Sequence, residues 1–323
     1  MPEEREVIII GAGISGLLCA NMLHEHGKNP LLLEKSRGVG GRMATRRIEN
    51  GRCDHGAQFL TARDLRFQMY VDRWQEEGVC ENWYAAEGSE LGAQGYVRYR
   101  GVQGMTDMPK QLAKDLDVRL QSQVSRVEFK SGKWLIFIEG EHVYTCDSLF
   151  VTAPLPQSLN LLERGGSELS PTLQNELGGI RYSKAFTLMV TLEGPNEKEI
   201  PEGFRPKGGV ISWIGDNQRK GISPELPILT VHATASYSKQ TWNDKEEEKV
   251  KPLLEALKPH ISSKISHWQC HRWAFAFPVN PWHEVYFKDP DRSLYLAGDA
   301  FGGPRVEGAA LSGIQAATDF LCS

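Results

Sequence analysis

The sequence lacks the features that mark several large classes of protein. Its 37 lysines and arginines do not outnumber its 41 aspartates and glutamates, and a formal net charge of −4 gives no basic excess for binding nucleic acid. It contains no apolar run of about 18 residues, so we expect no membrane span. It contains no internal repeat and no low-complexity tract. The acidic start, residues 1–6, lacks the basic flank of a signal peptide, so we expect no secretory leader.

Cysteines are few and scattered along the chain. The six are Cys19, Cys53, Cys80, Cys146, Cys270 and Cys322. No pair forms Cys-x-x-Cys, and none has the clustered spacing of a zinc site. We therefore interpret them as reduced, mostly buried thiols of a cytoplasmic protein that binds no metal.

The bulk composition is that of an ordinary globular protein. Of the 323 residues, 40% are hydrophobic and 24% are charged, which is ample for a sizeable core. Since single cores stop growing at about 250–300 residues, this length favours two domains.

The most informative stretch is residues 6–34. An apolar run at 7–10 is followed by a Gly-x-Gly-x-x-Gly turn, an apolar helical pattern, and a second apolar run that ends on Glu34. This order predicts a strand, a tight turn, a helix and a strand, which is the βαβ unit that binds dinucleotides. The turn comprises Gly11, Ala12, Gly13, Ile14, Ser15 and Gly16.

Each glycine of the turn has a physical role in such a unit. Gly11 permits the sharp turn, Gly13 lets the backbone approach a pyrophosphate, and Gly16 lets the helix pack close to the strand. The free N–H groups at the helix start attract the phosphates. A carboxylate at Glu34 can accept both ribose hydroxyls and would repel a 2′-phosphate. The alternative is a glycine-rich turn without a ligand.

The residues after Glu34 distinguish between dinucleotides. Lys35 is followed by a glycine-rich loop that contains Gly41, Arg42 and Met43. This loop resembles the flavoprotein pattern in which Gly-Gly-Arg follows the ribose acid, as in FAD enzymes related to monoamine oxidase, polyamine oxidase and phytoene desaturase. In those enzymes the segment equivalent to Gly56, Ala57 and Gln58 passes beneath the flavin. The alternative for the loop is a basic surface segment.

His55, just before that segment, allows two interpretations. It could act as a catalytic base, but a polar residue on a turn is the interpretation that we favour. Further along, strands are predicted at 124–129, 133–138 and 148–153, and a polar helix at 158–177. In related flavoproteins the strand at Val124 contacts the adenine. From 185 to 283 strand-like runs dominate, interrupted by one helix at 245–257, which predicts a second, mainly antiparallel domain.

A second flavin signature lies near the end of the chain. An apolar strand at 293–297 ends in Gly298 and Asp299, and a loop leads to a Gly/Ala-rich helix start at Glu307, Gly308 and Ala309. Asp299 is expected at the ribityl chain and pyrophosphate. The helix start is expected to direct N–H groups at the flavin, where they stabilise negative charge on its reduced form.

The whole chain resembles the renalase family, a branch of the amine-oxidase-like flavoproteins. The segments that carry the resemblance are 35–43, 56–64, Gly104-Met105, His271-Arg272-Trp273, Gly298-Asp299 and 305–309. The implied fold class is α/β: a Rossmann-like FAD-binding domain of the GR2-type flavoproteins (1–60, 100–157 and 285–323) with a mainly antiparallel β substrate domain (61–99 and 158–284).

The resemblance also implies a reaction. Renalase-like enzymes oxidise the 2- and 6-dihydro isomers of NAD(P)H: hydride passes to flavin N5, and O2 reoxidises the flavin to give NAD(P)+ and H2O2. The implied substrate pocket consists of Phe59, Thr61, Arg63, Arg98, Tyr99, Trp273 and Arg305. An arginine at 63, 98 or 305 could orient a carboxamide or a phosphate, or each could form a surface or inter-domain salt bridge. No cysteine lies near Asp299 or Arg305, so we expect FAD to be noncovalent.

Two other functions stay open. The first is an amine oxidase with an aromatic cage, for which Tyr96, Tyr99, Trp273 and Phe275 are candidates, and a lysine near the flavin, for which Lys184 is the candidate. The second is a flavin-binding protein without turnover. We assign no certain catalytic residue, and the expected partners are a small molecule and O2.

Overall fold

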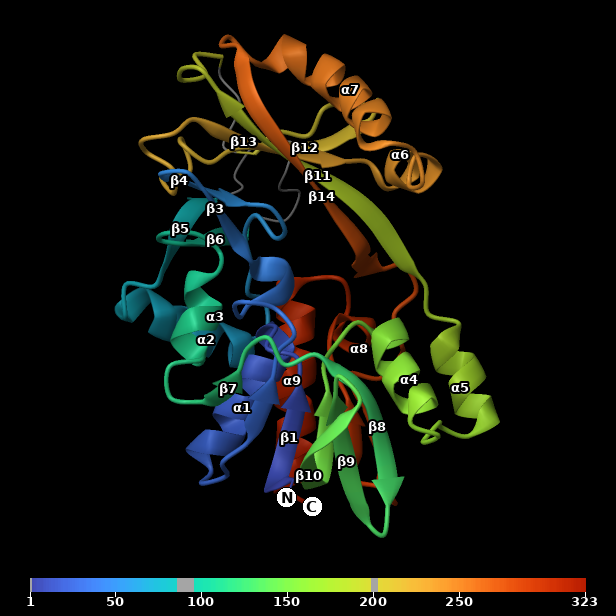
Figure 1. The fold of residues 1–323 in the computed structure, drawn as a ribbon. Coiled ribbons are helices and arrows are strands. Elements are labelled where there is room, and N and C mark those ends of the chain that lie inside the picture. The colour runs from blue at the N-terminus through green and yellow to red at the C-terminus, as the bar shows by residue number, and fades with distance from the viewer. Residues whose placement is uncertain (1, 86–95, 199–202) are drawn as a thin grey trace. The chain divides into compact units, whose positions relative to one another are not determined.

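The computed structural model describes residues 2–85, 96–198 and 203–323, and the chain divides into two compact units (Figure 1). The first unit comprises Met1–Gly41, Pro109–Arg181 and Phe277–Ser323, and the second comprises Arg42–Met108 and Tyr182–Ala276. The domains predicted from the sequence assign 42–60 and 100–108 to the cofactor-binding part instead, and they assign 158–181 and 277–284, which belong to the first unit, to the substrate part. Those segments pack within the second unit because Cys53 lies against Thr230 and Met105 against Asp54. Packing does not decide which segments contact the cofactor, so that assignment stays a prediction.

The first unit is built on a sheet whose central strands are parallel, in the order β15-β16-β10-β1-β2-β7. The parallel strands are β1 (Glu3–Ile10), β2 (Leu31–Leu33), β7 (Asp117–Arg119), β10 (Glu141–Val151) and β16 (Leu294–Leu296). The antiparallel ones are β8 (Val124–Lys130), β9 (Lys133–Ile138) and β15 (Phe287–Asp289). Parallel strands in this order confirm the α/β class that the sequence predicts.

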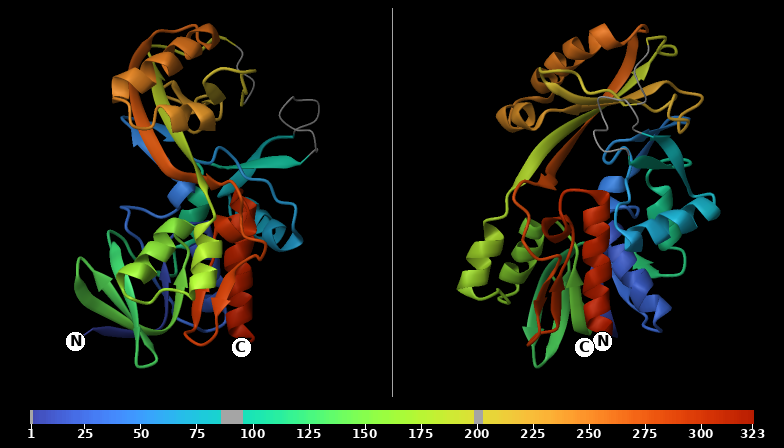
Figure 2. Two further views of the ribbon diagram at one scale, coloured as in Figure 1. Left: turned by 90° about the vertical axis from the view of Figure 1, so that its right-hand side faces the viewer. Right: turned by 180° about the vertical axis from the view of Figure 1, so that it is seen from behind.

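Helices accompany this sheet. Those of the first unit are α1 (Ile14–Glu25), α4 (Leu155–Arg164), α5 (Pro171–Gly178), α8 (Asp299–Gly302) and α9 (Val306–Leu321), and α3 (Asp107–Leu112) bridges the unit boundary in sequence. Figures 1 and 2 show α1 and α9 running side by side along the parallel strands. The helical segment predicted at 158–177 is two helices, because Gly165 ends α4 and the Ser170 hydroxyl caps the start of α5.

The second unit contains an antiparallel sheet in the order β12-β13-β11-β14. Its strands are β11 (Tyr182–Leu192), β12 (Ile211–Asp216), β13 (Ile228–Ala233) and β14 (Ile265–Pro278). The predicted helix at 245–257 is α7 (Glu246–Leu257), followed by the 3-10 helix η2 (Lys258–His260), and it buries Val250, Leu253 and Leu257 against one face. An additional short helix, α6 (Ala235–Gln240), begins where the Thr234 side chain caps it.

Two hairpins and one helix complete the second unit. They are β3 (Thr45–Ile48) with β4 (Gly51–Asp54), β5 (Cys80–Ala85) with β6 (Val97–Gly101), and α2 (Leu65–Glu76), and the 3-10 turn η1 (Gly41–Met43) precedes β3. Ile48 and Cys53 of the first hairpin pack against Met189 and Ile228 of the sheet. The β3–β4 hairpin therefore covers the face opposite to α7, as Figure 1 shows.

Candidate functional site

The glycine-rich turn has the geometry that the sequence predicts. Gly11 has φ +105°, and a Cβ built on it would lie 2.9 Å from Thr152 Oγ1. A Cβ on Gly16 would lie 2.1 Å from the carbonyl oxygen of Gly11, so only glycine permits this approach of helix and turn. A Cβ on Gly13 would meet no described atom within 4 Å. The first and third glycines thus serve packing, and the second leaves open space beside the helix start.

The start of α1 offers hydrogen-bond donors to that space. Ile14 and Ser15 form its first turn, and no side chain caps it within the described chain. The buried hydroxyl of Ser15 also has no hydrogen-bond partner among the residues that the structure describes. First-turn N–H groups have no intrahelical acceptor, and buried polar groups are normally paired. The turn therefore fits a pyrophosphate.

Glu34, just after β2, is held beside the same turn. It is buried, and its two carboxylate oxygens accept hydrogen bonds from Ala12 N (2.9 Å) and Ser36 N (2.8 Å). Each oxygen keeps a further lone pair, so ribose hydroxyls can still donate to it. Lys35 is exposed, with Nζ 3.3 Å from Gln157 Oε1. Val124 is buried at the start of β8.

The loop after Glu34 returns to the glycine-rich turn. Gly40 N donates to the carbonyl of Ala12 (2.8 Å), and a Cβ on Gly41 would lie 3.7 Å from Gly13 Cα. Gly41 has φ +53°, in the left-handed region. The backbone of the second glycine-rich loop therefore reaches the position expected of a pyrophosphate site, as the flavoprotein pattern implies.

The second signature meets the first inside the same unit. Gly298, at φ +130°, donates its N–H to Ser312 Oγ (2.8 Å), and the buried Asp299 begins α8. A Cβ on Gly308 would lie 2.2 Å from the carbonyl oxygen of Gly302, so Gly308 is required for α8 to pack against α9. Glu307 and Ala309 are buried in the first turn of α9. The residues present at these helix starts fit a flavin dinucleotide.

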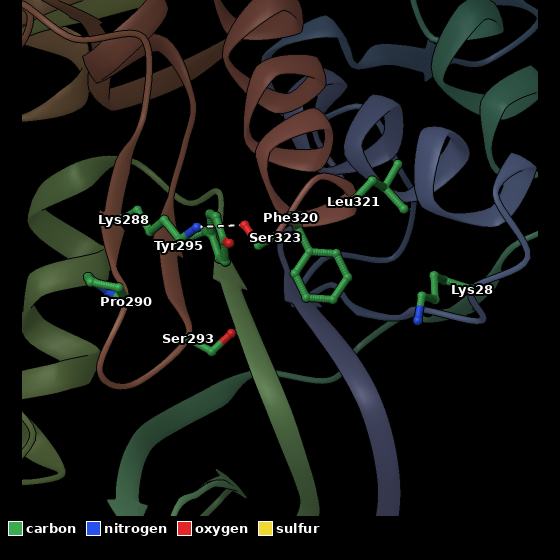
Figure 3. A pocket seen from close by; sticks show the side chains of 8 residues that line it. All are labelled: Lys28, Lys288, Pro290, Ser293, Tyr295, Phe320, Leu321 and Ser323. Atoms are coloured by element: carbon green, nitrogen blue, oxygen red, sulfur yellow. Dashed lines mark hydrogen bonds between the residues drawn. The ribbon is translucent and has the colours of Figure 1, made fainter.

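A pocket elsewhere in the first unit is not a candidate for that cofactor. Figure 3 shows its lining: Lys28, Lys288, Pro290, Ser293, Tyr295, Phe320, Leu321 and Ser323. Ser293 precedes β16 and Leu321 ends α9, so the pocket lies at the opposite end of the parallel strands from Gly11. In α/β sheets ligands bind at the carboxyl ends of the strands. Its lysines are also paired: Lys28 with Glu6 and Lys288 with Asp319.

In the second unit, Arg42 organises the segment from Gly56 to Gln58. The carbonyl of Arg42 accepts from Ala57 N (2.8 Å), and a Cβ on Gly56 would lie 2.0 Å from it. The Arg42 guanidinium donates to the carbonyls of Phe275 and Ala276, 3.3 Å to each. Met43 is buried, and its carbonyl accepts from Thr106 Oγ1. Gly56 is therefore explained by close backbone packing.

A buried ion pair fixes the other end of that segment. Lys220 Nζ lies 2.6 Å from Asp54 Oδ2 and also donates to the carbonyl of Gln58 (2.5 Å). The second oxygen of Asp54 accepts from Thr45 Oγ1 and Met105 N. Burial lowers the pKa of Lys220, and Asp54 acts against that shift. Sequence reasoning missed this pair because its members are far apart in the chain and match no motif.

Aromatic rings and cations gather around Phe59. The Arg98 guanidinium lies 4.6 Å from the centre of the Phe59 ring, and Trp213 and Trp83 lie 5.8 and 6.3 Å from it. Arg98 and Tyr99 are buried, and Tyr99 exchanges two backbone hydrogen bonds with Leu60. The structure therefore brings Phe59, Arg98 and Tyr99 together.

Three other predicted substrate residues, Thr61, Arg63 and Arg305, are not part of the group around Phe59. Arg63 is exposed and lies over the Tyr96 ring at 4.4 Å, and Thr61 is half-buried. Arg305 is exposed at the N-cap of α9, in the first unit, whereas the other six predicted residues belong to the second. Whether Arg305 acts on the same substrate stays a prediction.

Trp273 belongs to a cluster with two histidines. Its ring is 5.2 Å from His55 and 4.2 Å from His271, and its Nε1 donates to the carbonyl of His55 and to Thr187 Oγ1. Burial lowers the pKa of His55 to about 3. It also lowers the pKa of His232, on β13, to about 4. The pKa of His271 is also lowered by burial. His55 is thus a buried residue of the irregular segment that follows β4, and its lowered pKa favours the neutral ring.

The described part of the chain shows neither a metal site nor a membrane-spanning helix. No group of three or more His, Cys, Asp or Glu side chains there could hold a metal ion, and none of its helices is long and apolar enough to cross a membrane. All six cysteines are free thiols, four of them buried, in agreement with the prediction.

Comparison with known proteins agrees with this geometry. Residues 9–74 match the NAD(P)-binding Rossmann-like domain, and residues 67–321 match the flavin containing amine oxidoreductase family. Renalase from Mus musculus is 25% identical over 289 residues, with 84% of each chain covered. Polyamine oxidase 4 of rice (Oryza sativa subsp. japonica) is 23% identical, over 79% of this chain and 58% of that protein. The solved structure of cyclohexylamine oxidase from Brevibacterium oxydans has a TM-score of 0.73 at 14% identity, with 98% of each chain covered.

Proposed function

Because the chain belongs to the flavin containing amine oxidoreductase family, we propose that it is an FAD-dependent oxidase of the 2- and 6-dihydro isomers of NAD(P)H. The substrate loses a hydride and becomes NAD(P)+, and O2 takes up the two electrons with two protons, one of them from solvent, to give H2O2. FAD, when bound, supplies the hydride acceptor. The similarity to mouse renalase supports this choice within the family.

The observation that carries the proposal is that cationic side chains lie over aromatic rings of the second unit. Arg98 lies over Phe59, Lys220 over Trp83 (4.8 Å) and Arg205 over Trp213 (5.8 Å). A cage for an amine needs free aromatic faces, whereas these already hold cations. Lys220 is neutralised by Asp54, so the cations that attract the phosphates of a dinucleotide are Arg98 and Arg205. The arrangement therefore favours an anionic dinucleotide over an amine.

The lysine nominated for the amine oxidase alternative does not face the other candidate residues. Lys184 lies 4.5 Å from the centre of the Trp242 ring, and Trp242 stacks on Phe186 in the core beneath α7. Trp273 lies on the opposite face, where it contacts Thr187. Lys184 therefore points away from the His55–Trp273 cluster. Of the proposed cage, Phe275 packs against Tyr182 and Tyr96 lies under Arg63.

The residues of the second unit suit a reaction that needs no base. Loss of a hydride alone aromatises a dihydropyridine, so no proton has to be abstracted. His55 and His232 are held neutral by burial, and Asp54 is committed to Lys220. None of these three groups is therefore available as a base, and the reaction needs only that the substrate is held in the right orientation.

We further propose that FAD is held without a covalent bond. No cysteine adjoins Asp299 or Arg305 in the sequence, and Cys19 and Cys146 of the first unit are buried. Acid precipitation should release all the flavin into the supernatant. The free thiols fit a reducing compartment such as the cytoplasm.

Anaerobic stopped-flow absorbance tests the function. The yellow holoenzyme is mixed with an aged NADH preparation that contains the 2- and 6-dihydro isomers, and separately with benzylamine and with spermine. We expect rapid loss of the flavin's long-wavelength band with the isomers only, and formation of H2O2 when O2 is admitted. Bleaching with an amine alone would overturn the proposal in favour of an amine oxidase, and bleaching with neither would favour a flavin-binding protein without turnover.

A further inference from the structure

Four polar atoms of the second unit are buried without a hydrogen-bond partner in the described chain. One is His55 Nδ1, in the cluster with Trp273, and the other three are Gln58 Oε1, Trp213 Nε1 and His232 Nε2. Gln58 and Trp213 are buried and His232 is half-buried, and Trp213 is paired with His232 between β12 and β13. An unpaired buried group costs about 1–3 kcal/mol, and such groups are normally paired. Three at one place indicate a ligand group that the protein is built to receive.

Two of these atoms converge on one point. A Cβ built on Gly215 would lie 2.9 Å from Trp213 Nε1 and 3.0 Å from Gln58 Oε1. Gly215 has an ordinary extended conformation, since it lies inside β12 opposite Thr230. Backbone strain therefore does not require glycine here. Glycine is instead required by packing, because a Cβ at this position would crowd both polar atoms.

The hydrogen-bonding character of the atoms follows from their other bonds. The amide nitrogen of Gln58 donates to the carbonyls of Asp54 (2.5 Å) and Gly56 (3.2 Å), so Oε1 is an acceptor. Trp213 Nε1 is a donor only. The His55 backbone raises the pKa of His232, which is the effect of a carbonyl that accepts from a ring nitrogen. Since Nε2 has no partner, we assign that role to Nδ1, which makes Nε2 the acceptor of the neutral ring. The set is one donor and two acceptors.

We propose that Gln58, Trp213 and His232 form a receptor for a primary carboxamide on a planar ring. Trp213 Nε1 donates to the amide oxygen, while Gln58 Oε1 and His232 Nε2 accept from the amide N–H groups. Phe59, 5.8 Å from Trp213, supplies an apolar wall for the ring. The inference rests on the proposed function, since a dihydronicotinamide carries such a group, and it names the residues that select it.

Calorimetric titration of the holoenzyme with small pyridines tests the receptor. The probes are nicotinamide, 3-acetylpyridine, which keeps the carbonyl but has no N–H, and nicotinic acid, whose carboxylate has acceptors only. We expect nicotinamide to bind at least about tenfold more tightly than either, because an unpaired buried acceptor costs about 1–3 kcal/mol. Equal affinity for the three probes would overturn the proposal.

Variants assign the preference to these residues. Trp213→Phe keeps an aromatic ring but loses the donor, so we expect the nicotinamide affinity to fall about tenfold. Gly215→Ala, whose new methyl crowds both polar atoms, should lower that affinity as well. The matched controls are Trp268→Phe, which packs against the core on the opposite face, and Gly194→Ala, whose Cβ would make an ordinary 3.6 Å contact. Both should keep the preference.

Failure of the receptor and failure of the function can be told apart. If wild-type protein oxidises the dihydronicotinamide isomers and Trp213→Phe keeps the full preference for nicotinamide, the receptor is wrong and the function stands. If Trp213→Phe weakens all three probes equally, the three atoms surround a structural water and the receptor is also wrong. If the preference is lost in Trp213→Phe although no isomer is oxidised, the receptor stands and the function fails.

Discussion

Gly313 in α9 touches the backbone of Ser15 in α1 so closely that a Cβ on Gly313 would lie 2.0 Å from the Ser15 carbonyl oxygen. This contact joins the glycine-rich turn near the start of the chain to the helix near its end. Because α8 also packs against α9, the contact brings the first turn of α1 and the segment from Gly298 to Ala309 to the same helix. The proposed cofactor site of the first unit therefore depends on helix packing as well as on its own residues.

The first prediction concerns this contact. Gly313→Ala should lower the free energy of unfolding by about 1–3 kcal/mol, because the methyl group forces α1 and α9 apart. It should also lower the flavin content, measured as the ratio of flavin to protein absorbance after purification. Gly178→Ala in α5, where a Cβ would meet no described atom within 4 Å, is the control. Equal flavin content in both variants would contradict the argument.

The second prediction concerns Glu34. Glu34→Ala removes the acceptor for Ala12 N and Ser36 N together with the proposed acceptor for ribose. Because hydrogen bonds to a charged group contribute about 1.5–3 kcal/mol, the Kd for FAD should rise about tenfold to a hundredfold. Fluorescence titration of the apoprotein with FAD measures it. Glu163→Ala, an exposed glutamate of α4, should leave that Kd unchanged.

A structural feature of this protein can be predicted from the sequence when residues close together in the chain determine it. The turn at Gly11 to Gly16, the acid at Glu34 and the helix start at Glu307 are set by spacing within a few residues, so the fold class and the backbone geometry at these places were predictable. The helix α6 was not predicted from the sequence, because it is short and depends on the Thr234 cap. The segments that were predicted are therefore those whose conformation depends on residues close in sequence.

The substrate side was less predictable for a physical reason. Phe59, Arg98 and Tyr99 could be named by resemblance, but Trp213 reaches Phe59, and Lys220 reaches the Gln58 carbonyl, only through tertiary packing. Alternation along β12 and β13 could have placed Trp213 and His232 on one sheet face, yet register between strands is not readable from either strand alone. The role of Gly215 follows only from three-dimensional proximity.

The third prediction separates a dinucleotide from an amine as substrate. Arg98→Gln should raise the KM for the dihydronicotinamide isomers about tenfold or more, with a smaller change in kcat, because it removes a cation that attracts phosphate. The matched control is Arg272→Gln, whose guanidinium lies 4.4 Å from the Trp242 ring on the opposite face of the sheet. Steady-state H2O2 formation gives both constants. A similar rise in KM in both variants would speak against a phosphate role for Arg98.

The fourth prediction concerns the buried pair of Asp54 and Lys220. Lys220→Met leaves Asp54 buried without its counter-ion, so the free energy of unfolding should fall by about 3–5 kcal/mol. The double variant Asp54→Asn/Lys220→Met should recover part of that loss, since no uncompensated charge remains. Urea denaturation measures both. If the double variant is no more stable than the single one, the charge of Asp54 is not the cause.

The last prediction is a dependence of stability on pH. The pKa values of His55 and His232 lie near 3 and 4 in the folded protein but near 6.5 when the chain is unfolded. Between these values the unfolded chain binds more protons, so stability is complete above about pH 6.5 and falls as the pH drops toward 4, by up to about 1.4 kcal/mol per pH unit for each histidine. His232→Phe should flatten this slope in urea denaturation, whereas His283→Phe, which replaces an exposed histidine, should keep it. An unchanged slope in His232→Phe would show that His232 is not buried in its neutral form.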